Sequence, residues 1–260
     1  MSAANNRHEL IATAEREEPL RPHKHLKAVF ERTLACFVAS APIQRLLDGK
    51  INVQHYKAFL RETYFYTREN PQLQAWITAW FKGEDRRMVK PFLRHAISEI
   101  GHDQLALDDL KSLGANILSI PHGYPLSATS AFTAFPFWSA QFRNPVSYLG
   151  YLYFLEAMPT TSGEGLMKAL ERIGIPQTAM TFISDHTTID VSHIKLMDIY
   201  LDKLIKNETD LSDVSYAIEA TGELYTAMIH AAFHSIDTEK SYDYVDLNEK
   251  DTISLMQLVD

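Results

Sequence analysis

Residues 185–193 read D-H-T-T-I-D-V-S-H. In this stretch His186, Asp190 and His193 are spaced i, i+4 and i+7, which places all three side chains on one face of an α-helix. Imidazole and carboxylate groups are ligands that suit iron, zinc or manganese. The pattern predicts half of a transition-metal site, and a polar, solvated helix face is the alternative interpretation of this stretch alone.

A second group of the same kind lies upstream. Glu99 and His102 have helical i, i+3 spacing, and Glu156 stands within the apolar and aromatic run Y-L-Y-F-L-E-A-M-P. A lone buried carboxylate is costly, so Glu156 must either face solvent or bind something positive. These three histidines and three carboxylates exceed the needs of one catalytic zinc ion and suit two iron or manganese ions. Glu156, between the two histidine-bearing helices, is predicted to be the bridging, catalytic carboxylate.

Composition restricts the classes of function. The 260-residue chain has a formal net charge of −8 and no cluster of lysine and arginine, which argues against nucleic acid or an anionic membrane surface as a partner. Cys36 is the single cysteine, so no internal disulfide is expected, and we interpret it as a small buried residue of the first helix. Without an apolar leader or a membrane-spanning run, a cytoplasmic protein is expected.

The apolar spacing is helical throughout, which predicts a single all-α domain. We expect an N-terminal arm at 1–22, a helical domain at 23–236 and an acidic tail at 237–260. Residues 115–145 contain several prolines and are expected to be a long loop with at most a short helix. The predicted helices cover about 23–40, 43–49, 53–81 with a kink at Asn70-Pro71, 85–113, 146–158 ended by Pro159, 164–173, 177–206, and Asp210 or Ser212 to about 235.

The order Glu99-x-x-His102, Glu156, His186-x-x-x-Asp190-x-x-His193 resembles that of the haem-oxygenase-like di-iron oxidases, relatives of the TenA and PqqC proteins. The likeness extends over about residues 50–230 and includes Y-K-A-F-L-R-E-T-Y-F-Y-T-R-E-N-P, E-I-G-H-D-Q-L and F-I-S-D-H. It implies a haem-oxygenase-like (TenA/PqqC-like) helical bundle. It also implies that these six residues are metal ligands, with an extra glutamate in some members, here Glu69 or Glu62.

The resemblance implies an O2-activating oxidase or oxygenase with two iron ions, or with manganese in one site, and with O2 as co-substrate. Its small-molecule substrate would be an amino acid, an amine or a fatty acid. An external electron donor and a homodimer are further expectations. A metal-free TenA- or PqqC-like enzyme and a non-enzymatic binding protein on the same scaffold are the alternatives. TenA chemistry needs a nucleophilic cysteine in the pocket, and Cys36 in the first helix does not fit that role.

Other residues are predicted to support this site. His95, one heptad before His102 and on the same face, is assigned either a supporting or a purely structural role. Asp103 or Asp185 is a candidate to orient an imidazole through its other ring nitrogen. Arginine binds carboxylates through two hydrogen bonds. The candidates to hold a substrate carboxylate are therefore Arg61, Arg68, Arg94 and Arg143.

Overall fold

The computed structural model describes residues 22–238, apart from the side chains of residues 188–194. Every regular element in this part of the chain is a helix, which confirms the predicted all-α class. Short 3-10 turns connect several of the α-helices, among them η2 (Gly83–Met88). The α-helices are α1 (Pro22–Ala39), α2 (Ala41–Leu47), α3 (Val53–Thr67), α4 (Asn70–Ile77), α5 (Val89–Ser98), α6 (His102–Ser112), α7 (Ser127–Phe142), α8 (Tyr148–Arg172), α9 (Thr181–Leu204) and α10 (Glu208–Asp237).

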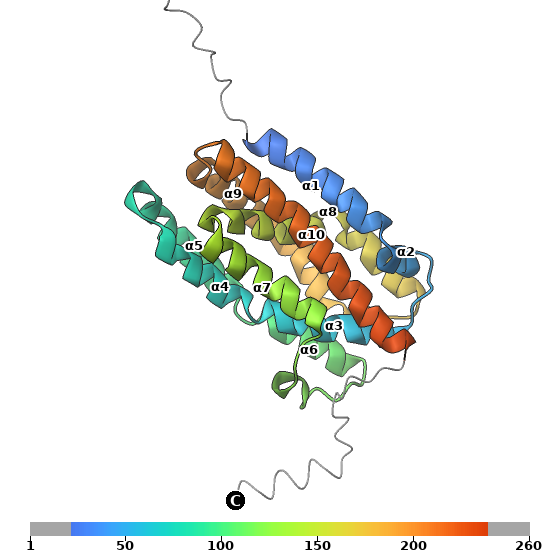
Figure 1. The fold of residues 1–260 in the computed structure, drawn as a ribbon. Coiled ribbons are helices and arrows are strands. Elements are labelled where there is room, and N and C mark those ends of the chain that lie inside the picture. Colours follow the sequence, from blue (N-terminus) through green and yellow to red (C-terminus); the bar gives the residue numbers. More distant parts are fainter. Residues whose placement is uncertain (1–21, 239–260) are drawn as a thin grey trace, which may run out of the picture.

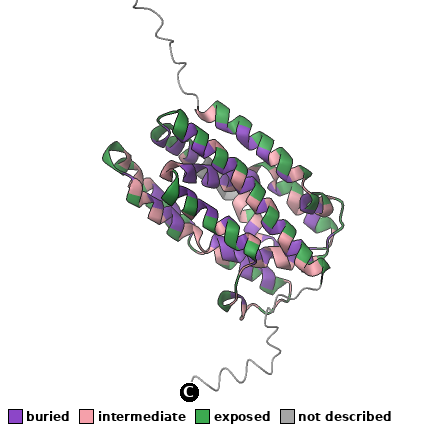
Figure 2. Ribbon diagram, viewed as in Figure 1, coloured by how far each residue is buried: buried purple, intermediate pink, exposed green. Residues whose placement is uncertain are grey.

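The helices form one bundle around α8 (Figure 1). α8 packs against both α9 and α10, α10 also contacts α1, α3 and α7, and α6 lies against α3 and α9. The buried residues lie on the inward faces of the helices and the exposed residues on the outward faces (Figure 2). None of the described helices is long and apolar enough to cross a membrane. Burial of these apolar faces holds the helices that carry the candidate ligands in fixed positions.

Glycine lets α8 approach its neighbours closely. A Cβ added at Gly150 would overlap the backbone carbonyl of Val214 on α10, and one added at Gly163 would overlap the side chain of Thr187 on α9. Small residues at such crossings reduce the distance between helix axes, because ridges of side chains no longer separate the backbones. The close approach of α8 to α9 brings Glu156 and His186, one from each helix, to the same region.

The predicted continuous helix over 85–113 is wrong. α5 ends at Ser98, α6 begins at His102, and residues 99–101 form a turn in which Gly101 has a φ of 99°. A residue in this left-handed region interrupts a right-handed helix, and glycine adopts it at little cost because it lacks a Cβ. Glu99 therefore caps the C-terminal end of one helix, and His102 is the first residue of the next.

Proline misled the prediction at two places. The expected loop over 115–145 contains the 16-residue α7 with Pro136 inside it, and α8 continues through Pro159 to Arg172. Next to Pro159, the side-chain hydroxyls of Thr160 and Thr161 donate hydrogen bonds to the backbone carbonyl of Ala157. Both helices bury long faces in the bundle, and this packing outweighs the backbone hydrogen bond that a proline removes.

Two other helix boundaries were predicted from short sequence motifs, one at Asn70-Pro71 and one at the start of the last helix. The predicted interruption at Asn70-Pro71 is confirmed, because α3 ends at Thr67 and α4 begins at Asn70. The last helix starts earlier than expected, at Glu208, because the Asn207 side chain accepts a hydrogen bond from the backbone N–H of Asp210. Asp210 lies in the first turn and accepts from the backbone N–H of Lys206. The predicted arm at 1–22 and tail at 237–260 lie almost entirely outside the described residues.

Candidate metal centre

Four of the six predicted ligands come together inside the bundle. Glu99 at the end of α5, His102 at the start of α6, Glu156 in α8 and His186 in α9 are separated by up to 87 positions in sequence (186 − 99). Two three-residue groups have ligand atoms that all lie within 4.8 Å of one another. One is His95, Glu99 and Glu156, the other is Glu99, His102 and His186, and Glu99 belongs to both.

The first group is fully buried. His95 is 1% exposed, and Glu99 and Glu156 are each 7% exposed. The Nε2 atom of His95 lies 3.1 Å from Glu156 Oε1 and 3.6 Å from Glu99 Oε1. Burial disfavours the charged imidazolium, but hydrogen bonding to the two carboxylates and their negative charge outweigh burial and raise the pKa of His95 to about 9. The two carboxylates thus strongly stabilise a positive charge placed between them.

The second group joins the helix break to α9. His102 Nδ1 lies 3.0 Å from Glu99 Oε2, and the rings of His102 and His186 are 4.9 Å apart between centroids. Hydrogen bonding to Glu99 raises the pKa of His102. Burial alone would raise the pKa of Glu99, but hydrogen bonds from His102 and His95 bring it well below its usual value. Glu99 is therefore a carboxylate, the form that binds a cation.

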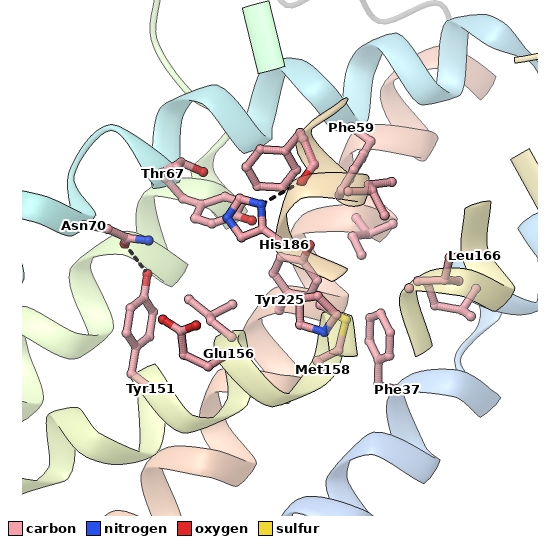
Figure 3. A pocket seen from close by; sticks show the side chains of 18 of the residues that line it. Phe37, Phe59, Thr67, Asn70, Tyr151, Glu156, Met158, Leu166, His186 and Tyr225 are labelled. Atoms are coloured by element: carbon pink, nitrogen blue, oxygen red, sulfur yellow. Dashed lines mark hydrogen bonds between the residues drawn. The ribbon is translucent and has the colours of Figure 1, made fainter. Parts of the chain in front are cut away.

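His186 is held as a neutral imidazole. Its Nδ1 donates a hydrogen bond of 2.7 Å to the carbonyl of Phe182, one turn earlier in α9, drawn as a dashed line in Figure 3. Burial lowers the pKa of His186, and the Phe182 ring lies 4.2 Å from its ring. A hydrogen bond from Nδ1 to a backbone carbonyl is the usual way of fixing the tautomer of a metal-binding histidine, and it leaves Nε2 as the ligand atom.

The residues fit a metal of the iron, manganese or zinc type. Two buried carboxylates, Glu99 and Glu156, both approach His95, and burying like charges together is costly without a counter-charge. The two groups together offer three imidazoles and two carboxylates, which are ligand types that suit these metals. A cation at this place would satisfy the carboxylates and use His102 and His186 in their neutral, ligating form.

The structure places the remaining predicted ligands as follows. α9 continues as a helix through Asp190 and His193, but their side chains lie outside the described residues. Glu62 is buried and accepts hydrogen bonds from the Leu126 N–H and the Thr129 hydroxyl at the start of α7. Glu69 is partly exposed and pairs with Arg68. Neither glutamate belongs to the two groups that surround Glu99.

His95 belongs to this cluster, although its sequence did not decide between a supporting and a structural role. The signal for it was the heptad spacing to His102, but the helix break at Gly101 puts the two histidines on different helices, where heptad spacing does not apply. Asp185 Oδ2 lies 3.8 Å from His102 Nε2, which is too far for a hydrogen bond, so the orienting role of Asp185 stays a prediction. Asp103 accepts a hydrogen bond from Gln104. The expectation that Cys36 is buried is wrong, because its side chain lies on the exposed face of α1.

Comparison with known proteins identifies the family. A family model described as an iron-containing redox enzyme matches residues 57–231, which is more than half of the chain. This chain belongs to the iron-containing redox enzyme family. The match includes the positions of Glu99, His102, Glu156 and His186, and also those of Asp190 and His193. A search of curated proteins found no match.

Solved structures confirm the fold of this family member. A domain of unknown function with a haem-oxygenase-like fold from Shewanella denitrificans OS217 is 25% identical, with a TM-score of 0.78, over 87% of this chain and 98% of that one. A TenA homologue from P. horikoshii OT3 is 12% identical with a TM-score of 0.66, over 83% and 99% of the two chains. A TenA homologue from Pseudomonas syringae pv. tomato DC3000 is 11% identical with a TM-score of 0.65, over 86% and 100%. The predicted haem-oxygenase-like, TenA-like helical domain is confirmed.

Proposed function

We propose that this protein is an O2-activating, non-haem di-iron oxidase or oxygenase, with manganese in one position as a variant. Its substrate is a small molecule of the amino-acid, amine or fatty-acid type. The observation that carries the proposal is the position of Glu99, a buried carboxylate shared by two groups of imidazole and carboxylate ligands. A carboxylate shared by two ligand groups could serve two neighbouring cations, as carboxylates do in helical di-metal proteins.

The ligands divide between the two positions. His95 and Glu156 would hold one ion and His102 and His186 the other, with Glu99 available to both. Asp190 and His193 are proposed as further ligands from α9. The sequence favoured Glu156 as the bridging carboxylate, whereas the described geometry favours Glu99 for this role. Iron bound at this place would supply one-electron and O2 chemistry.

The protein prepares the site by excluding water and fixing the ligands. The burial of His95, Glu99 and Glu156 keeps bulk water away from the reacting groups. The Phe182 carbonyl holds the His186 ring in one tautomer. Because these contacts exist before substrate arrives, the ligand geometry needs little reorganisation. An external electron donor and a homodimer remain predictions.

The alternatives are a metal-free TenA- or PqqC-like enzyme and a non-enzymatic binding protein on this scaffold. Cys36 is exposed on α1 and does not line the cavity beside Glu156, so it is not placed for nucleophilic chemistry there. A binding protein would have no need of several buried ionisable groups around one carboxylate, which are costly for folding. The metal-dependent enzyme is therefore the stronger candidate.

Anaerobic titration of the metal-free protein with Fe(II), followed by exposure to O2, tests the proposal. We expect uptake of about two iron ions per chain and a transient visible absorption after O2 is added. His186→Ala should lose the transient and part of the iron uptake. His230→Ala is the matched control, because His230 is an exposed histidine on α10. Failure of the wild-type protein to take up iron stoichiometrically would refute the proposal.

A further inference from the structure

An internal cavity extends from the candidate metal centre into the apolar part of the bundle. Glu99, Glu156 and His186 line one part of it. In Figure 3, Asn70, Tyr151 and Glu156 lie together on one side, and Phe37 and Leu166 lie on the opposite side. The lining away from the metal centre is aliphatic and aromatic, and includes Phe37, Ile43, Leu46, Leu166 and Phe233. The cavity is thus polar at one end and apolar at the other.

Gln74 provides an unused hydrogen-bond donor in this cavity. It lies on α4, is 1% exposed and lines the cavity one turn beyond Asn70. Its Nε2 has no hydrogen-bond partner among the described residues. Asn70, by contrast, accepts a hydrogen bond of 2.8 Å from the Tyr151 hydroxyl. A buried amide donor without a partner costs stability, and a ligand with an acceptor atom would remove that cost.

The described lining contains no arginine or lysine. Of the four arginines considered from the sequence, Arg61 pairs with Glu62, Arg68 with Glu69 and Arg143 with Asp213, while Arg94 is exposed. These four arginines therefore do not bind a substrate carboxylate in this cavity, contrary to the expectation from the sequence. Amides and hydroxyls, together with the metal centre, are what the polar end offers to a head group.

We infer that the cavity binds a molecule with an alkyl or acyl chain, and that Gln74 positions its oxygen-bearing head group. The chain would lie along the apolar lining towards Phe37 and Leu166, and an oxygen of the head group would accept a hydrogen bond from Gln74 Nε2. This choice deepens the proposed function, since among the three substrate types it favours the one with a long apolar part. An amino acid with a charged side chain would place that charge against the apolar lining, which is unfavourable.

Binding to the metal-free protein tests this inference independently of iron. The probes are 1-butanol, 1-hexanol and 1-octanol, measured by isothermal titration calorimetry. We expect the affinity to rise by about fourfold for each added methylene, because each is removed from water. 8-Amino-1-octanol, with a charged end in the apolar part, should bind at least about tenfold more weakly than 1-octanol. An affinity that does not change with chain length would overturn the inference.

Variants distinguish the contribution of the head group to binding affinity from that of the alkyl chain. Gln74→Leu should weaken 1-octanol binding by about fivefold, as expected for one neutral hydrogen bond, without weakening binding of n-hexane, which has no head group. Gln104→Leu, an exposed glutamine on α6, is the matched control and should bind all probes as the wild type does.

Leu166→Phe should reduce the affinity for 1-octanol more than for 1-butanol, since it fills the apolar end. Circular dichroism and urea unfolding establish that each variant is folded. If Gln74→Leu binds 1-octanol as tightly as the wild type, Gln74 has no positioning role. Loss of iron uptake with intact alcohol binding would count against the proposed oxidase alone.

Discussion

The metal-free protein should lose stability as pH rises, because of His95. The carboxylates of Glu99 and Glu156 raise the pKa of this histidine to about 9 in the folded protein, against about 6.5 in an unfolded chain. Between these values the folded state holds one more proton than the unfolded state, so the free energy of unfolding falls by about 1.4 kcal/mol per pH unit. His95 is buried, so solvent screening does not reduce the effect, and the total is about 3 kcal/mol.

Urea unfolding of chelator-treated protein at pH 6 and pH 9.5 measures this effect against His95→Gln. The stabilisation by charged His95 is fully present below pH 6.5 and is lost as pH passes through 9. The difference in unfolding free energy between wild type and His95→Gln should therefore shrink by about 3 kcal/mol between the two pH values. His230→Gln, at an exposed histidine, should show no such change. A difference that stays constant with pH would show that His95 is not charged in the folded, metal-free protein.

Two further predictions concern the turn before His102 and the open choice of an extra glutamate. Gly101→Ala should lower the free energy of unfolding by about 1–2 kcal/mol, because its φ of 99° strains any residue with a Cβ, and iron titration should show weaker uptake. Gly165→Ala, on the exposed face of α8 with no atom near its Cβ, should instead be neutral or stabilising in the same urea assay. Glu62→Gln should cost about 1–3 kcal/mol, because the buried carboxylate accepts hydrogen bonds from Leu126 and Thr129, but should leave iron stoichiometry unchanged. Iron loss in that variant would place Glu62 among the ligands.

The sequence could predict those site residues whose role follows from their own helix or from their neighbours in sequence. Glu156 was recognisable because a carboxylate among aromatic residues needs a partner, and His186 because α9 is a regular helix. The role of His95 was not predictable, since its contact with Glu156 joins residues 61 positions apart on different helices. The same limit applies to Gln74, whose importance comes from an unpaired amide in a cavity and not from any motif.

Proline and glycine show where local propensity fails in the fold. Pro159 suggested a helix end and Pro136 a loop, yet both lie inside helices whose buried faces outweigh one lost hydrogen bond. Gly101 was read as part of a continuous helix, because a glycine inside a helical pattern is tolerated and does not by itself reveal a positive φ. Tertiary packing decided the two proline positions, and it is not visible in a short window of sequence.

The break at Gly101 also explains why the local electrostatics of Glu99 and His102 point to a bound cation. Glu99 lies at the C-terminal end of α5, where the helix dipole disfavours a carboxylate, and His102 lies at the N-terminal end of α6, where it disfavours an imidazolium. The two helix dipoles thus oppose this charged pair, although the contact between the two residues favours it. A bound metal ion would remove both unfavourable effects. It would compensate the charge of the Glu99 carboxylate, and it would require a neutral His102, the form that the α6 dipole favours. Conflicts of this kind between local preference and observed structure are expected where a sequence serves function before stability.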